Sequence, residues 1–184
     1  LLVIAQNTVC FTIDPNPNTN DPALAPFTKY VDVLGCLSIY AESTVSDAKV
    51  LHAAAVAAEL LDNNEDGILD DQLIEAQLIS ESALMPIFFQ DGNAAMYTFF
   101  NHYNGNGVSA VLFNNEIDPT QTGHWGDDAT VEEIMHTINH VGHTNVYPNA
   151  FSLQANSSLL TAAMDVARGG QFMTIPNPYP AAAW

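Results

Sequence analysis

The sequence predicts an α+β fold, with a small mixed or antiparallel sheet of about four strands backed by one alanine-rich helix. Apolar residues make up 48% of the 184 positions, which is enough to bury a full core. Residues 46–61 repeat apolar side chains at helical spacing, and several runs rich in β-branched and aromatic residues are bounded by turn formers. We therefore expect a single domain over residues 1–184.

Four segments are predicted as strands because they combine β-branched or aromatic residues with flanking turn formers. They are residues 1–13, 30–41, 83–90 and 108–117. Pro86 lies inside the third, and since proline cannot donate to a sheet ladder, it marks an edge strand or a bulge. Residues 14–26 contain four prolines and three asparagines, which predicts an extended surface connection.

Helices are predicted where apolar side chains recur every three or four residues. In the helix over residues 46–61, Val50, Ala54, Ala58 and Leu61 share one face. Its alanines indicate close packing against a sheet. Further helices are expected over residues 71–80, 94–103, 127–143 and 157–168, the last ended by Gly169 and Gly170.

Three cations stand against 21 acidic residues, giving a net charge of −18. Nucleic acid and anionic membrane surfaces are poor partners for such a field, whereas divalent cations are good ones. No apolar run reaches the roughly 18–20 residues needed to span a bilayer. The sequence also lacks the phosphate-binding glycine motifs and the nucleophile motifs of serine and cysteine hydrolases.

The acidity of the chain, a candidate disulfide and a calcium-type loop over residues 62–73 together favour an extracellular setting. Cys10 and Cys36 either form one disulfide or remain two buried thiols. Residues 1–5 read either as the end of a signal peptide or as a packed strand. Asn156 opens a glycosylation sequon. The chain ends on small apolar residues, and we expect the natural product to extend beyond Trp184.

Residues 62–73 match the first half of a calcium-binding EF-hand loop, with the order D-x-N-x-D-G. Asp62, Asn64 and Asp66 would supply side-chain oxygens, and Ile68 its carbonyl. Gly67 permits the sharp bend. Calcium takes six to eight oxygen ligands, so this alternation of short oxygen-bearing side chains suits it.

The twelfth position of the loop departs from the motif, because Leu73 stands where an EF-hand has a bidentate glutamate. Asp70, Asp71 or Glu75 would have to substitute. The alternative is a solvated acidic turn between two helices. We predict a calcium site with a structural role, which pins the two helices together.

The helix over residues 127–143 places His136, His140 and His143 on one face together with Glu133. Imidazoles at i and i+4 can bind one metal ion, so the pattern predicts a transition-metal site, with zinc the favoured ion. Two alternatives stay open. Thr130 and Glu133 fit a capping box, and His143 follows Gly142, where the helix can end.

The run His136–His143, with the letters HTINHVGH, resembles the metal helix of zincin-type metallopeptidases, which carries H-E-x-x-H. The resemblance implies zinc ligation by His136 and His140 and a peptidase activity. It also departs from the family: Thr137 stands in the position of the catalytic glutamate, and His143 comes too soon for the third histidine of the extended motif. Glu133, or another residue elsewhere in the chain, would then have to act as the base. The chain also resembles a set of secreted proteins that pair a D-x-N-x-D-G loop with an E-x-x-H helix.

Further metal ligands could come from outside this helix. Asp165 occupies a place where zincin relatives have a downstream carboxylate, although an ion pair with Arg168 explains it equally. The remaining candidates are His124 as a ligand, Tyr147 as an oxyanion donor, His52 as a core residue behind the site and His102 as a loop residue.

Two functions are therefore predicted. The first is a secreted protein that binds zinc and calcium and acts as a metal-dependent peptidase or hydrolase on peptide or protein substrates. The alternative is a non-catalytic, acidic extracellular protein that binds calcium or other metals in a matrix or an assembly.

Overall fold

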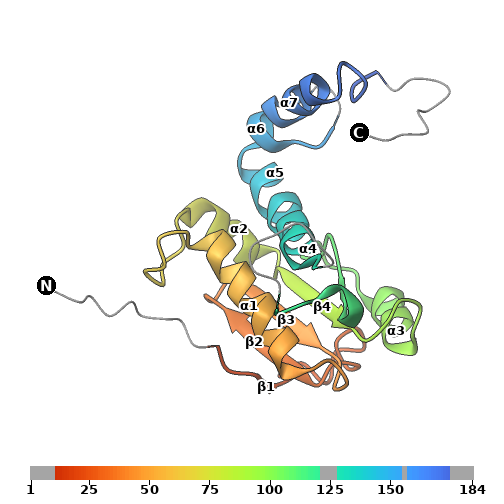
Figure 1. Cartoon of the computed structure of the whole chain (residues 1–184). Helices are drawn as coiled ribbons and strands as arrows, with labels where there is room; N and C mark the ends of the chain where they lie inside the picture. Colours follow the sequence, from red (N-terminus) through yellow and green to blue (C-terminus); the bar gives the residue numbers. More distant parts are fainter. Residues whose placement is uncertain (1–10, 121–127, 155–156, 175–184) are drawn as a thin grey trace, which may run out of the picture.

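A computed structural model describes residues 11–120, 128–154 and 157–174. It is an α+β fold built on a five-stranded mixed sheet, in the spatial order β1-β2-β3-β4-β5 (Figure 1). The strands are β1 (Asp14–Pro15), β2 (Lys29–Val33), β3 (Leu37–Ala41), β4 (Leu84–Phe88) and β5 (Leu112–Phe113). The first three pair antiparallel, and β3, β4 and β5 pair parallel.

Helices connect the parallel strands, as parallel pairing requires. Between β3 and β4 the chain forms α1 (Asp47–Leu61) and α2 (Gln72–Ser80), and between β4 and β5 it forms α3 (Ala94–His102). These three helices lie within two residues of the predicted boundaries. The predicted α+β class with a mixed sheet is therefore confirmed at this level.

The prediction of one strand over residues 30–41 is wrong, because this segment is a hairpin of β2 and β3. Leu34 and Gly35 both have positive φ, of 51° and 73°, in the three-residue loop (34–36) that the pairing of Val33 with Leu37 closes. A leucine at such a position is uncommon, so the sequence carries only a weak turn signal there.

Pro86 lies in a central strand, which corrects the expectation of an edge or a bulge. The carbonyls of Ala83 and Ile87 both accept hydrogen bonds from the β3 side, at 2.9 and 3.2 Å. Since alternate residues of a parallel strand bond to opposite neighbours, the nitrogen of Pro86 faces β5. Pairing with β5 begins only at Ile87, so the missing N–H breaks no ladder bond.

Three other segments differ from expectation. The predicted strand over residues 108–117 is reduced to β5 and a 3₁₀ turn at Asn114–Glu116. The predicted strand over residues 1–13 falls largely outside the described residues. The connection over residues 14–26 is folded inward, because the buried Asn16 side chain donates to the carbonyls of Leu24 and Phe27 at 2.8 and 2.9 Å.

Each face of the sheet carries its own core. On one face, α1, α2 and the helical segment after β5 cover a large aliphatic cluster that includes Ile39, Met85 and Ile87. On the other face, α3 and the loop before β2 enclose an aromatic cluster around Phe27, Phe88 and Phe99. The sheet is therefore the middle of three layers.

The chain after β5 forms one helical rod that crosses α1 and α2 and then leaves the body. It comprises α4 (Thr130–Thr137), a π-helical segment (Ile138–His143) and α5 (Thr144–Val146). Two further helices, α6 (Pro148–Phe151) and α7 (Leu159–Ala167), extend beyond the sheet (Figure 1). In the described part of the chain no helix combines the length and apolarity that a membrane crossing needs.

Gly107 allows the loop before β5 to approach the end of α2. Its carbonyl accepts from Leu84 N at 2.9 Å, and a Cβ at Gly107 would lie 2.6 Å from the Glu81 carbonyl oxygen and closer still to that of Ser82. We predict that Gly107→Ala lowers the free energy of unfolding by about 1–3 kcal/mol, because backbone must move to admit the methyl group. Urea unfolding measures the loss. The exposed Asn104→Ala is the control, and an unchanged midpoint in Gly107→Ala would contradict this packing.

Candidate functional site

The calcium-type loop has the predicted position between two helices. Helix α1 ends at Leu61, and α2 begins at Gln72 with Asp71 as its N-cap. The Asp71 carboxylate accepts from the amides of Leu73 and Ile74, at 2.9 and 3.2 Å. The loop is thus fixed to a helix at both ends.

Oxygens of the motif side chains converge on the loop backbone. The amide of Asp66 donates to Asp62 Oδ1 at 3.2 Å and to Asn64 Oδ1 at 3.0 Å. Asp62 Oδ2 accepts from Gly67 N at 2.7 Å. Because two oxygens from different residues share one amide, they lie close together. A carboxylate has about four lone-pair sites, so these bonds leave room for a cation.

The bend in the loop depends on backbone conformations that the motif supplies. Gly67 has a φ of 84°, where glycine is favoured, and Glu65 has a φ of 59°. Leu69 is buried at 5% exposure and holds the loop against the core, whereas the Ile68 side chain is exposed. An exposed side chain at Ile68 is compatible with the predicted use of its carbonyl.

The candidates for the missing glutamate differ in their surroundings. Asp70 Oδ2 accepts from Asn63 N at 3.0 Å across the loop, so this carboxylate closes the loop on itself. Asp71 already caps α2, and its other oxygen accepts the Tyr147 hydroxyl at 2.7 Å. Leu73 is 60% exposed and provides no oxygen ligand from its side chain. Asp70 is therefore the better-placed candidate ligand.

The histidine helix contains a feature that sequence periodicity does not encode. Residues 138–143 form a π-helix, in which the Thr144 amide donates to the Asn139 carbonyl, five residues earlier. In a π turn each residue rotates the chain by less than the 100° of an α-helix. His143 is consequently rotated away from the face that an α-helix would share among the three histidines.

The three histidines have different environments. His136 is exposed, with Nε2 3.8 Å from Glu132 Oε1. His140 is exposed and lines a polar hollow of about 300 Å³ together with Glu81, Asn106 and Asn145. His143 is half-buried against the Phe151 ring, at 4.8 Å between centroids. Burial lowers the pKa of His143, and the nearby Asp71 and the Ile138 carbonyl oppose that shift.

Glu133 projects from α4 in a partly buried position. Burial raises its pKa, Glu132 and Glu116 add to the rise, and His136 opposes it. The alternative of a capping box between Thr130 and Glu133 is not formed, because the N-cap of α4 is Ala129 and no side chain makes a cap hydrogen bond. Asp128, one residue earlier, accepts from Thr130 N at Oδ1 at 3.1 Å, and the Ala129 amide donates to the Glu116 carbonyl.

The other candidates are dispersed. Asp165 Oδ1 accepts from the amides of Phe172 and Met173, at 3.1 and 2.8 Å, and so closes the end of α7. His102 Nδ1 contacts the Thr98 carbonyl at 2.8 Å. Cys36 is buried, its thiol donates to the Val33 carbonyl at 3.7 Å, and burial raises its pKa to about 12. His124 and Cys10 lie outside the described residues, as does the predicted pairing of Cys10 with Cys36.

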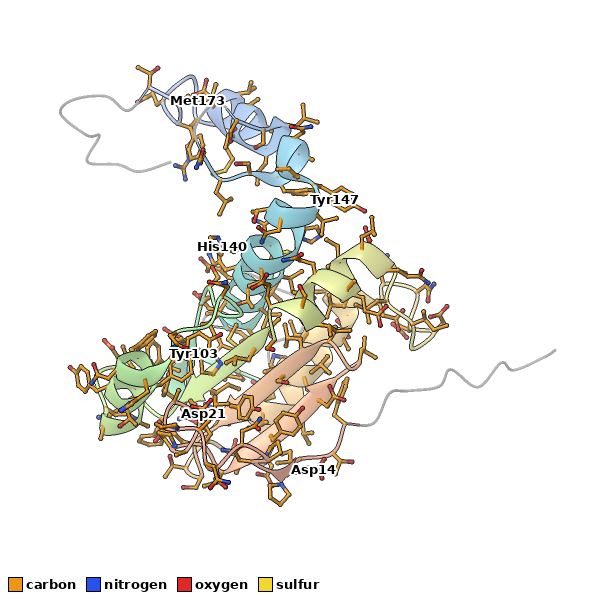
Figure 2. The ribbon with its side chains drawn as sticks, turned by 180° about the vertical axis from the view of Figure 1, so that it is seen from behind. Asp14, Asp21, Tyr103, His140, Tyr147 and Met173 are labelled. Carbon is orange, nitrogen blue, oxygen red and sulfur yellow. The ribbon has the colours of Figure 1, made fainter. Side chains whose placement is uncertain are left out.

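Two pairings that organise the region lie far apart in sequence. His52 Nε2 contacts Asp128 Oδ2 at 2.8 Å, which joins α1 to the start of α4. Tyr147 donates to Asp71 and thereby joins the end of the rod to the start of α2. In Figure 2 His140 and Tyr147 lie on opposite sides of the rod. The His52–Asp128 pair and the Tyr147–Asp71 pair each join residues 76 positions apart, and no local sequence pattern indicates which partners meet.

Within residues 11–120, 128–154 and 157–174, no three His, Cys, Asp or Glu side chains gather closely enough to hold a metal ion. A zinc site would therefore need His136 and His140 with a ligand such as His124. The candidate calcium ligands differ from these zinc ligands in kind, since they combine two carboxylates with an amide oxygen and a backbone carbonyl.

No family model, curated protein or solved structure matches this chain. The resemblance to zincin-type metallopeptidases therefore stays a prediction. The loop and the rod have to be interpreted from their own geometry.

Asp128 should contribute measurably to stability. Burial tends to raise its pKa, but hydrogen bonds from Thr130, His52 and the Asp118 amide outweigh burial and lower it. A carboxyl with a lowered folded-state pKa stabilises the fold above its ordinary pKa, and this contribution is lost as the pH falls through the folded-state value. We predict that Asp128→Ala costs about 1–3 kcal/mol near neutral pH.

The difference between Asp128→Ala and the unmodified chain should shrink as the pH falls below about 4. Urea unfolding across a pH series measures it, with the exposed Asp91→Ala as the control. A difference that is constant with pH would contradict the assigned role.

Proposed function

We propose that this protein binds calcium in the loop over residues 62–71, and that the ion holds α1 and α2 in their relative positions. One observation carries the proposal: Asp62 Oδ1 and Asn64 Oδ1 accept the same amide hydrogen, within a helix–loop–helix that bends at Gly67. Oxygens gathered on one short loop suit a hard cation. The net charge of −18 further favours cation uptake.

The affinity should be modest. Asp62 and Asp66 offer carboxylates, Asn64 its amide oxygen and Ile68 its carbonyl, but Asp70 is not gathered with the other two carboxylates and Leu73 supplies no bidentate glutamate. Calcium sites with few charged ligands bind with a Kd of about 10⁻⁴–10⁻³ M, which is the range of extracellular modules. We therefore propose an extracellular setting, in which calcium at such concentrations keeps the loop filled.

Substitution of Leu73 tests the site by a gain of binding. Leu73 is exposed and is the second residue of α2, where an acidic side chain also suits the helix dipole. We predict that Leu73→Glu tightens calcium binding about tenfold or more, because it restores the twelfth ligand of the loop. Leu73→Gln, of the same length but without the charge, should change the Kd much less. Isothermal titration calorimetry measures both.

Removal of a candidate calcium ligand provides the complementary test, a loss of binding. Asp66→Asn should weaken calcium binding and remove the rise in melting temperature that calcium produces, whereas Glu59→Gln, an exposed charge on α1, should do neither. If the EDTA-treated chain takes up no calcium and Leu73→Glu does not gain it, the loop is only an acidic turn.

Zinc-dependent hydrolysis is the second proposal. It is supported by Glu133, a partly buried carboxyl with a raised pKa one turn before His136, since a general base works best with a pKa near the working pH. His136 and His140 would hold zinc with a further ligand. Zinc, when bound, would lower the pKa of a water to about 7.

Elemental analysis and a chelator-sensitive peptide-cleavage assay test this second proposal. His136→Ala and His140→Ala should each abolish zinc binding and leave calcium binding intact. Glu133→Gln should keep zinc and lose cleavage. Retained zinc stoichiometry in both histidine variants would eliminate the histidine site, and zinc without cleavage would favour a non-catalytic metal-binding protein.

A further inference from the structure

The sheet face opposite α1 carries an open hollow of about 680 Å³, which shares no residue with the calcium loop and shares Glu81 with the smaller hollow beside His140. Its floor includes the outer side of β2 and β3, and its walls come from the loop before β2, the end of α2 and the loop after α3. In Figure 2 the labelled residues Asp21 and Tyr103 mark two of these walls. The volume lies within the range of small-molecule sites, about 300–1,000 Å³.

Two kinds of side chain dominate the chemistry of this hollow. Three carboxylates line it, those of Asp21, Asp32 and Glu81, together with three phenol rings, those of Tyr30, Tyr40 and Tyr103. Tyr30 and Tyr40 form a tilted pair with ring centroids 5.1 Å apart. Among the described residues that line the hollow there is no lysine or arginine, and one imidazole, that of His102, is included.

Burial and the negative charge around the hollow raise the pKa of two tyrosines that line it. Burial raises the pKa of Tyr103, and Glu81 and Asp21 raise it further. Burial likewise raises the pKa of Tyr40, with Tyr30 and Asp21 adding to the effect against a hydrogen bond from Asn18. The carboxylates from separate walls therefore act on the same open hollow, and a further negative charge is disfavoured there.

The three carboxylates are not neutralised by the chain's lysines. Lys29 pairs with Asp47 at 2.6 Å, on the edge of α1, and Lys49 donates to the Asn114 carbonyl. Asp21 Oδ1 accepts from Ala23 N at 2.8 Å, and Glu81 accepts from the side-chain amides of Gln77 and Asn106. These neutral donors orient Asp21 and Glu81 without adding positive charge, and among the described residues no ion pair forms with Asp21, Asp32 or Glu81.

We propose that this hollow is a binding site for an organic cation that carries alkylammonium groups. Carboxylates supply ion pairs to such a ligand, and an aromatic face attracts it through the negative charge of its π system. The half-buried Tyr30 is the ring that offers such a face, since Tyr40 is 3% exposed and one face of Tyr103 stacks on Phe99. A calcium ion does not need aromatic faces, and a neutral ligand does not need three uncompensated carboxylates. The combination therefore selects an ammonium group on an apolar chain, from a free amine or from a lysine side chain.

Calorimetric titration of the full chain with 1,4-diaminobutane tests the proposal, with 1,4-butanediol as the neutral isostere. We expect saturable binding of the diamine and little of the diol. N-acetyl-lysine amide, titrated alongside, shows whether the single ammonium of a lysine side chain suffices or a free diamine is needed. Binding by either supports the site.

Charge-matched variants locate the binding. Asp32→Asn, in the hollow, and Asp66→Asn, in the calcium loop, each remove one negative charge. We expect Asp32→Asn and Tyr30→Ala to weaken diamine binding about three- to tenfold, and Asp66→Asn to leave it within about a factor of two. Tyr30→Phe, which keeps the ring, should bind nearly as the unmodified chain does.

Three outcomes overturn the proposal. If the unmodified chain shows no saturable diamine binding, the hollow takes no organic cation. If Asp32→Asn and Asp66→Asn weaken binding equally, the diamine only condenses on a uniformly acidic surface. If the diol binds as tightly as the diamine, hydrogen bonding selects the ligand and charge does not.

Discussion

Close approach of backbones, permitted by small side chains, is the constraint on which this structure depends. Ala53, Ala54 and Ala57 are fully buried on α1, where the helix packs against the sheet and α4. Gly142 performs the same function in the π segment, since a Cβ there would lie 3.1 Å from Ile74 Cγ2 on α2. The rod thus fixes α1 and α2 together, and with them both ends of the acidic loop.

This arrangement bears on how the loop would bind an ion. A loop whose two helices are already held in place loses less conformational freedom when a ligand arrives than one that must fold around it. The hydrogen bonds among Asp62, Asn64 and Asp66 give the same advantage within the loop itself. If the proposed ion binds, ligand number and charge would limit its affinity more than the ordering of the chain.

Local patterns in the sequence predict a good part of this fold. The alternation of oxygen-bearing side chains identifies the acidic loop, and the apolar spacing gives α1, α2 and α3 within two residues. The hairpin was missed because Leu34 and Gly35 form a turn whose residues give a weak signal, with buried residues on both sides. The position of Pro86 depends on where β5 begins to pair, which is a property of the sheet.

The candidate site was less predictable for a related reason. An α-helical projection put three histidines on one face, but the widened turn at Ile138–His143 changes the rotation between His140 and His143. The contacts of Asp128 with His52 and of Tyr147 with Asp71 join positions that only the folded chain brings together. The hollow on the sheet face opposite α1 combines residues from five separate segments, so no local sequence motif predicts it.

The π segment has a consequence for the helices that follow it. Its widened turn releases the His140 and Val141 carbonyls from the regular ladder, and they accept instead from the side chains of Thr144 and Asn145. Removal of one residue would restore α-helical spacing, which would turn everything downstream by about 100° and draw it back by about 1.5 Å. The direction in which α5 leaves the body therefore depends on this widened turn, whereas α6 depends also on the non-helical backbone at Tyr147.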